Sequence, residues 1–168
     1  FKLAQALIIV EQNSSGIAHP PFDPAGLLDL VALGTVADLA PLVGENRALV
    51  AQGLARLNAP ARPGIRALIK TASLAPGAVD AAAISFGLGP RLNAAGRLEH
   101  AMAAYRLLAT GDAAEAERLA IELNERNRER QRLTRETQDK ARELALIHGA
   151  DVLLLFAASP EFRAGIVG

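Results

Sequence analysis

The sequence contains no cysteine, so disulfide bonds and thiolate metal sites are both excluded. Any bound metal must be held by carboxylates or histidines, which suits hard or borderline ions such as Mg²⁺ and Mn²⁺. The longest apolar runs, such as Val152–Ala158, are too short to cross a bilayer as a helix. These absences favour a domain without covalent cross-links whose chemistry depends on oxygen and nitrogen ligands.

The charge has no excess of either sign, because 18 basic residues balance 18 acidic ones. This balance argues against a uniformly basic surface that coats nucleic acid, but it leaves local basic patches open. Hydrophobic residues make up 51% of the 168 positions. A chain of this length and composition can bury a sizeable core in one domain, or form the junction of two.

Apolar spacing predicts several short helices. Asp80 is a plausible N-cap for one of them, because its carboxylate can accept the free N–H groups of the first turn. Residues Leu27–Leu39 are almost all apolar, and periodicity does not decide there between a buried strand and a buried helix, which Pro41 would end in either case. Asn13–Gly26 is rich in Ser, Pro and Gly and predicts a loop. The expected helices are Phe1–Val10, Glu45–Leu57, Gly64–Ser73, Ala81–Leu88 and Leu98–Ala109.

The clearest element is a long helix over Asp112–His148, which Asp112 can cap and Gly149 can end. At about 1.5 Å per residue it would be roughly 55 Å long, so we expect it to project beyond the body or bridge two bodies. The following segment, Asp151–Ala157, predicts a buried strand. We place a domain boundary near Ala150.

Two aspartates near the first long apolar stretch are candidate ligands. Asp38 follows a nearly continuous apolar run and must be solvated, paired or bound to a metal, because a bare buried carboxylate is costly. The simpler structural interpretation is that Asp38 is a helix-cap or turn residue. Asp29 is the competing candidate. For Asp29 a purely structural role is the stronger explanation, because it follows Gly26 and could simply start a helix.

A glycine-spaced segment, Gly87–Arg97, carries the second candidate site. Its glycines let the backbone approach a ligand, and Arg91, Asn93 and Arg97 supply forked cations and an amide suited to phosphate oxygens. The alternative is a tight turn between helices with solvated arginines. The segment is neither a P-loop nor a dinucleotide-binding fingerprint.

A run of arginines within the long helix is the third candidate. Glutamates three or four residues before several of them predict surface ion pairs, and a solvated bridging helix is the simpler interpretation. The apolar stripe of this helix is interrupted by Asn124, Asn127 and Arg130, which could face a partner domain or a strand of nucleic acid.

Four segments in order resemble the RecJ branch of the DHH phosphoesterase superfamily. They are FKLAQAL, LLDLVALGTVADLAPLVGENRALV, ISFGLGPRLNAAGRL and LNERNRERQRLT, and the resemblance that they carry covers nearly the whole chain. The resemblance implies an α/β protein, with residues 1–111 as the mostly helical C-terminal part of a DHH-type catalytic domain. Residues 112–149 would be the long connecting helix, and residues 150–168 the first strand of a smaller, substrate-binding second domain.

The resemblance also implies a 5′→3′ exonuclease that hydrolyses single-stranded DNA with two Mn²⁺ or Mg²⁺ ions, in repair and recombination. Asp38 would be a metal ligand, Asn93 and Arg97 catalytic residues, and Arg91, Asn93, Arg97, Asn127 and Arg130 contacts to the DNA phosphates. The implied partners are a single-strand-binding protein and a RecQ-type helicase. The family resemblance further implies a monomer that works on the nucleoid in the bacterial cytoplasm.

The Asp-His-His triplet that names the superfamily is absent from the sequence. One carboxylate cannot hold two hard cations, so we expect this polypeptide by itself to have no nuclease activity. Two alternatives remain open. One is a related DHH phosphodiesterase that acts on short oligonucleotides or cyclic dinucleotides, and the other is a non-catalytic DHH scaffold of replication.

Overall fold

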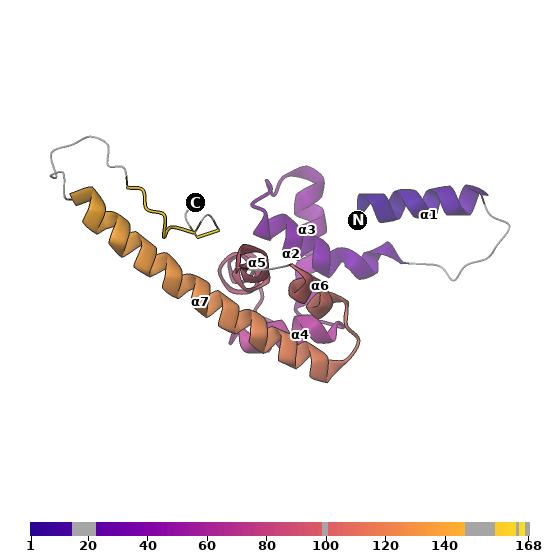
Figure 1. The fold of residues 1–168 in the computed structure, drawn as a ribbon. Coiled ribbons are helices and arrows are strands. Elements are labelled where there is room, and N and C mark those ends of the chain that lie inside the picture. The colour runs from indigo at the N-terminus through magenta and orange to yellow at the C-terminus, as the bar shows by residue number, and fades with distance from the viewer. Residues whose placement is uncertain (15–22, 99–100, 147–156, 164, 167–168) are drawn as a thin grey trace.

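The computed structural model describes residues 1–14, 23–98, 101–146, 157–163 and 165–166. Within these ranges every regular element is helical (Figure 1). The elements are α1 (Lys2–Ser14), η1 (Pro24–Leu27), α2 (Leu28–Ala37), α3 (Gly44–Leu57), α4 (Pro63–Thr71), η2 (Ala83–Leu88), α5 (Gly89–Leu98), α6 (Met102–Ala109) and α7 (Ala113–Leu146). The expectation of a mostly helical chain is confirmed.

The undecided apolar segment is a helix, α2, and not a strand. It is apolar all round because it packs on α3 along one side and on η2 and α5 along the other. Ala32, Leu33 and Val36 are buried in the core there. A helix enclosed on several sides loses its amphipathic pattern, which explains why periodicity did not identify it.

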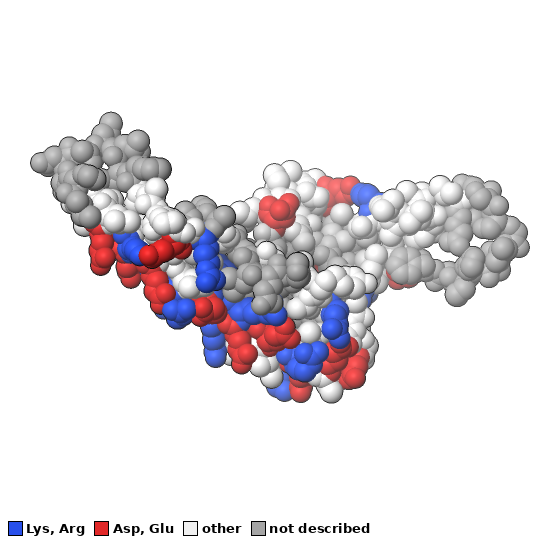
Figure 2. Space-filling view, viewed as in Figure 1, with Lys and Arg blue, Asp and Glu red and all other residues white. Residues whose placement is uncertain are grey.

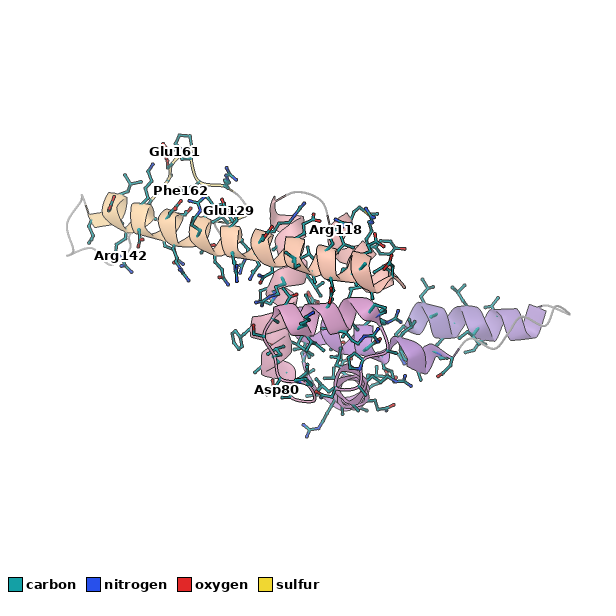
Figure 3. The ribbon with its side chains drawn as sticks, turned by 90° about the horizontal axis from the view of Figure 1, so that it is seen from below. Asp80, Arg118, Glu129, Arg142, Glu161 and Phe162 are labelled. Carbon is teal, nitrogen blue, oxygen red and sulfur yellow. The ribbon has the colours of Figure 1, made fainter. Side chains whose placement is uncertain are left out.

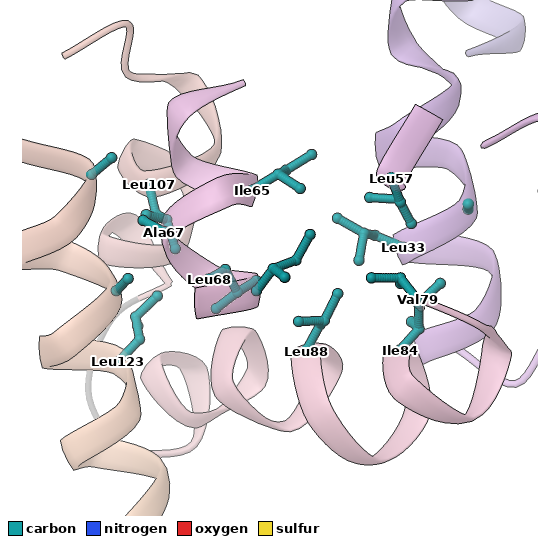
Figure 4. Packing of buried hydrophobic residues seen from close by; sticks show 14 of the residues in the cluster. Leu33, Leu57, Ile65, Ala67, Leu68, Val79, Ile84, Leu88, Leu107 and Leu123 are labelled. Carbon is teal, nitrogen blue, oxygen red and sulfur yellow. The ribbon is translucent and has the colours of Figure 1, made fainter. Parts of the chain in front are cut away.

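The hydrophobic core lies among α2, α3, α4, η2, α5, α6 and the first half of α7 (Figure 4). Its largest fully buried side chains are Leu57, Ile65, Leu68, Ile84, Leu88, Leu107 and Leu123. They come from five helices spread over nearly 70 residues of sequence, so these helices fold as one unit. The helix α1 lies apart from this core, with Leu3, Leu7 and Val10 exposed (Figure 1).

The long helix α7 has 34 residues, which corresponds to about 50 Å. The Asp112 carboxylate caps it as predicted, accepting the Ala114 N–H at 2.8 Å. Its first half packs on α4, α5 and α6, while its second half extends beyond the body (Figure 1). The prediction of a projecting helix is therefore confirmed.

Beyond α7 the structure describes only a short tail that lies back along the second half of the helix. There Glu161 forms an ion pair with Lys140, and Phe162 lies beside it (Figure 3). Of the predicted strand Asp151–Ala157, residues 151–156 lie outside the described part of the chain, as does the expected boundary at Ala150. None of the described helices is long and apolar enough to span a membrane.

Candidate functional site

The glycine-spaced segment is helical, and the expectation of a loop or tight turn there is wrong. Asp80 caps the helix that leads into this segment, as predicted, since its Oδ1 accepts the Ala83 N–H at 2.7 Å. The chain then forms the π-helix η2 and continues without a break into α5. A π-helical turn inside an α-helix is rare and occurs frequently at functional sites.

Gly89, the first residue of α5, allows this helix to approach α2 closely. A Cβ atom at this position would lie 3.2 Å from the Ala37 Cβ and 3.0 Å from the Ile84 carbonyl oxygen, which is tighter than most Cβ contacts in proteins, so the neighbouring atoms would have to shift. The glycine therefore serves helix packing and not a loop around a ligand. Its effect is to bring α5 against the end of α2, where Asp38 lies.

The end of α2 presents Asp38 to solvent. Asp38 is the C-cap residue, and Leu39 after it adopts a left-handed conformation with φ of 57°. The Leu39 N–H donates to the Val36 carbonyl and the Ala40 N–H to the Thr35 carbonyl, the pattern that ends a helix with a Schellman motif. A leucine in this region costs about 1–2 kcal/mol relative to a right-handed residue. Such strain commonly accumulates at functional sites.

The Asp38 carboxylate is exposed and has no hydrogen-bond or ion-pair partner among the described residues. Asp29 differs, because it is only 5% exposed and its carboxylate accepts the Arg62 Nε–H at 2.9 Å and the Leu30 N–H at 2.8 Å. The Asp29 carboxylate therefore already has hydrogen-bond partners, and its ion pair with Arg62 fixes the start of α2. Of the two aspartates, only Asp38 is free to take a ligand.

This difference predicts opposite effects on stability. Asp29→Asn removes the charge that Arg62 pairs with, and we expect the free energy of unfolding to fall by about 1–3 kcal/mol. Asp38→Asn changes an exposed group and should shift it by less than about 0.5 kcal/mol. Urea denaturation of the two variants measures both values, and equal losses would contradict the distinction.

A cavity of about 130 Å³ lies where α2, η2, α5 and α7 meet. It is lined by Ala37, Ser85, Gly89, Pro90, Asn93 and Arg130. Asn93 is exposed and Arg130 half-buried, so the amide and the guanidinium both reach the opening. The cavity thus offers a hydroxyl, an amide and a cation next to the residue that precedes Asp38, a set of groups that can bind a phosphate.

Arg91 does not line this cavity. Its Nε–H donates to Asn124 Oδ1 at 3.0 Å, and its Nη1 donates to the Gly87 carbonyl at 2.7 Å. Burial, reinforced by the positive charge of Arg128, lowers the pKa of Arg91. The two predicted phosphate-binding residues Arg91 and Asn93 therefore have different neighbours.

Asn127 is 3% exposed, and its Oδ1 accepts a hydrogen bond from Arg130 Nη2 at 3.1 Å. Asn124 is 8% exposed. The polar interruption of α7 thus faces α5 inside the molecule, and Arg130 alone of the three reaches the cavity. Arg97 lies in the last turn of α5, and its side chain is outside the described part.

Other arginines of α7, among them Arg118, Arg126 and Arg132, form surface ion pairs with glutamates, as the sequence predicted. Arg126 bonds to Glu122 at 2.8 Å, and Arg132 bonds to Glu129 at 2.6 Å. Basic and acidic side chains alternate along this helix (Figure 2). The exposed face of α7 is therefore a mixed surface and not a basic stripe.

The described residues contain no group of three or more histidine, aspartate or glutamate side chains that could hold a metal ion. His19, His100 and His148 lie outside them. Asp38 could supply one oxygen ligand, but a pair of hard cations needs several each. These residues by themselves do not fit a metal pair.

The residue that sequence reasoning missed is Ser85. It lies before the glycine-spaced segment, and no pattern marks a single serine between Ile84 and Phe86 as a ligand. It lines the cavity from within the π-helix η2. A feature of backbone geometry of this kind has no signature in composition or spacing.

Comparison with known proteins gives consistent relatives, although no protein-family model matches. The chain is 41% identical over 145 residues to the single-stranded-DNA-specific exonuclease RecJ of Bacillus subtilis, covering 86% of this chain and 18% of that protein. It is 43% identical over 149 residues to the RecJ of Escherichia coli, covering 86% of this chain and 26% of that protein. The chain thus spans about a fifth to a quarter of the length of these relatives.

Solved structures agree with the sequence relatives. A crystal structure of RecJ from Thermus thermophilus in complex with Mn²⁺ superposes with a TM-score of 0.72 at 42% identity, covering 89% of this chain and 22% of that one. A structure of exonuclease RecJ bound to manganese also gives a TM-score of 0.72, at 40% identity, covering 94% of this chain and 38% of that one. Sequence and fold point to the same proteins.

Proposed function

Because this chain is homologous to part of the RecJ single-stranded-DNA-specific exonucleases over most of its own length, we propose that it is the phosphate-binding and connecting segment of such an enzyme. The proposed reaction is hydrolysis of phosphodiester bonds in single-stranded DNA from the 5′ end, in repair and recombination. The observation that carries the proposal is the cavity in which Asn93, Arg130 and Ser85 lie beside the end of α2.

Asp38 is the proposed metal ligand of this segment. It is exposed, unpaired among the described residues and set at the end of a helix whose last turn is strained. RecJ structures have been solved with Mn²⁺ and with Mg²⁺, so we propose the same ions here. When bound, such ions would activate water and stabilise charge on the phosphodiester oxygens, and residues beyond those described must supply the other ligands.

Arg130 and Asn93 are proposed to bind the phosphate of the strand at the cavity, and Arg91 to bind it from the other side of α5. Arg97 keeps its proposed catalytic role, since the last turn of α5 directly follows Asn93. Asn127 is too deeply buried to touch DNA, so we propose that it acts through Arg130. These roles need only hydrogen bonds and positive charge, and of the groups involved Asn93 and Arg130 line the same cavity.

The proposed organisation follows the expectation from sequence. Residues 1–111 form the end of the catalytic domain, residues 112–149 the connecting helix and residues 150–168 the start of a second domain. The proposed partners are a single-strand-binding protein and a RecQ-type helicase, with the enzyme a monomer. The long projecting half of α7 supports a connector, because a single body would not need it.

A degradation assay tests the proposal. The full-length protein should digest a single-stranded oligonucleotide with Mn²⁺, release nucleotides from the 5′ end, and stop when the metal is chelated. The polypeptide of residues 1–168 should show no digestion under the same conditions, because its described residues contain no group of three or more side chains that could hold a metal ion. Robust digestion by the isolated polypeptide would contradict this.

The substrate length in the same assay separates the proposal from the alternative of a phosphodiesterase for short oligonucleotides or cyclic dinucleotides. We expect long strands to be degraded and cyclic dinucleotides to be left intact. A full-length protein with no activity on any of these substrates would favour the non-catalytic scaffold.

A further inference from the structure

The arginines in the second half of α7 differ in whether they are paired with a carboxylate. Arg132 is paired, because it bonds to Glu129 at 2.6 Å. Three other arginines of this half are exposed and form no ion pair within the described part of the chain, and they are Arg128, Arg135 and Arg142. The mixed surface of α7 thus contains two classes of arginine, one neutralised by a neighbour on the helix and one without an ion pair.

The arginines without an ion pair lie on one line along α7. They are seven residues apart, so each stands about two turns from the next on the same face of the helix. Between them on this face lie Gln131 and Gln138, which are also exposed, and Asn124 continues the line toward the body. We call this set of six side chains the arginine–amide row: Asn124, Arg128, Gln131, Arg135, Gln138 and Arg142.

The arginine–amide row contains no acidic residue, and carboxylates flank it along one edge only. Helical geometry places Glu129 and Asp139 on that edge. Figure 3 shows Arg142 on one side of α7 and Glu129 on the opposite side, where Glu161 of the tail also lies. Along the other edge lie three residues without charge, Asn127, Thr134 and Ala141. The row is therefore open to an anion from the edge away from the tail.

The row begins beside the candidate site. Its first member, Asn124, is buried against α5 and accepts the Arg91 Nε–H at 3.0 Å. Burial and the nearby charge of Arg128 lower the pKa of Arg91, so the two guanidinium groups lie close enough to repel each other. A hollow of about 390 Å³ lies between Arg128 and Arg135 and is lined by both. From there the row continues along the projecting half of α7 (Figure 1).

The spacing of these arginines suits a strand of nucleic acid. Seven residues of an α-helix rise about 10.5 Å. Phosphates of a stacked strand follow one another at about 3.4 Å, so three nucleotides span almost the same distance. From Arg128 to Arg142 the row would cover about six nucleotides. The guanidinium forks can bind phosphate oxygens at every third nucleotide, and the glutamine amides can donate hydrogen bonds between them.

The same seven-residue spacing is also that of a coiled coil, which needs apolar residues at the repeated positions. The row has none, since its members are arginines and amides. An apolar seam for a partner helix is therefore missing on this face, and a polyanion is the ligand that its chemistry fits.

We propose that the arginine–amide row binds the phosphates of the single strand and guides it from the candidate site along the projecting half of α7. The proposal rests on the proposed function, because it takes single-stranded DNA as the ligand. It adds Arg128, Arg135 and Arg142 to the residues that contact the strand. The second half of α7 then holds substrate as well as connecting two parts of the enzyme.

The test measures binding of single-stranded oligonucleotides to the full-length protein in the presence of a chelator, so that the strand is not digested. The row variant combines Arg128→Gln with Arg135→Gln, at exposed positions where the fold should be unaffected. We expect its affinity for a strand of about 20 nucleotides to fall about tenfold, at roughly threefold for each exposed contact. The slope of log affinity against log salt should become shallower by about 1.4, which corresponds to two lost phosphate contacts.

The matched control combines Arg118→Gln with Arg132→Gln. It removes the same number of arginines from the same helix, but these two are paired with Glu122 and Glu129. Affinity and salt slope should stay near those of the parent. A strand of about four nucleotides is a second control, because it is too short to occupy the candidate site and the row together. The parent and the row variant should bind this short strand equally well.

The outcomes separate this inference from the proposed function. A row variant that binds the long strand with the affinity and salt slope of the parent would overturn the inference. An equal loss in the paired-arginine control, or on the short strand, would overturn it as well, because the effect would then not belong to the row. A parent protein that neither binds nor degrades single strands would instead overturn the proposed function, and this inference with it.

Discussion

Asp38→Asn in the full-length protein should reduce the rate of metal-dependent digestion of single-stranded DNA by at least about 100-fold. The substitution keeps the size of the side chain and removes the charge that a hard cation requires. Loss of groups that merely support metal ligands already costs about 10–100-fold, so loss of a ligand should cost more. The measurement is the turnover number at saturating oligonucleotide over a range of Mn²⁺ concentrations.

Asp29→Asn is the matched control for this experiment, because it is the same chemical change nine residues away. Its carboxylate is held by Arg62, so the variant should lose stability but retain turnover at a temperature where it is folded. If Asp38→Asn keeps more than a tenth of the parental turnover, Asp38 is not a metal ligand. If Asp29→Asn is the inactive variant, the ligand has been assigned to the wrong aspartate.

Gly64→Ala should destabilise the fold by about 3 kcal/mol, the upper end of the usual cost of overpacking a core. A Cβ atom on Gly64 would lie 1.8 Å from the Leu107 carbonyl oxygen and 2.7 Å from its carbonyl carbon. Both atoms belong to backbone, so no side chain can rotate to relieve the clash. The helices α4 and α6 would have to separate, which opens the core around Ile65 and Leu107.

Denaturant unfolding followed by circular dichroism measures this effect as a lower midpoint. Gly34→Ala is the control, since this glycine is exposed within α2 and a Cβ there meets nothing within 4 Å. Alanine is favoured over glycine in a helix by up to about 1 kcal/mol, so the control should be slightly more stable than the parent. A Gly64→Ala protein as stable as the parent would show that the two helices are not packed as described.

Periodicity and capping residues were sufficient to predict most of the helices. α7 was the easiest, because Asp112 marks its start and 34 residues give the apolar pattern room to repeat. α3 and α4 were predicted from the apolar residues along one face of each helix. Where a helix is enclosed on several sides, as α2 is, the face disappears and periodicity has nothing to detect.

The candidate site was predicted less completely. The chemistry of Arg91, Asn93 and Arg130 was visible in their residue types, but their arrangement was not. Of the glycines in the segment Gly87–Arg97, Gly89 serves close helix packing, which is evident only from its contact with Ala37. Whether an asparagine faces water or a neighbouring helix depends on which helix crosses it, which a single sequence does not state.

The π-helical turn of η2 has a consequence for what variation the segment tolerates. Each residue of an α-helix advances the direction of the side chains by about 100°, so a change in the number of residues rotates everything that follows. Ile84 and Leu88 must point into the core while Asn93 must point at the cavity, and η2 sets the angle between them. A residue added or removed between Asp80 and Asn93 would turn Asn93 away from Arg130. Across related proteins this stretch should therefore stay constant in length.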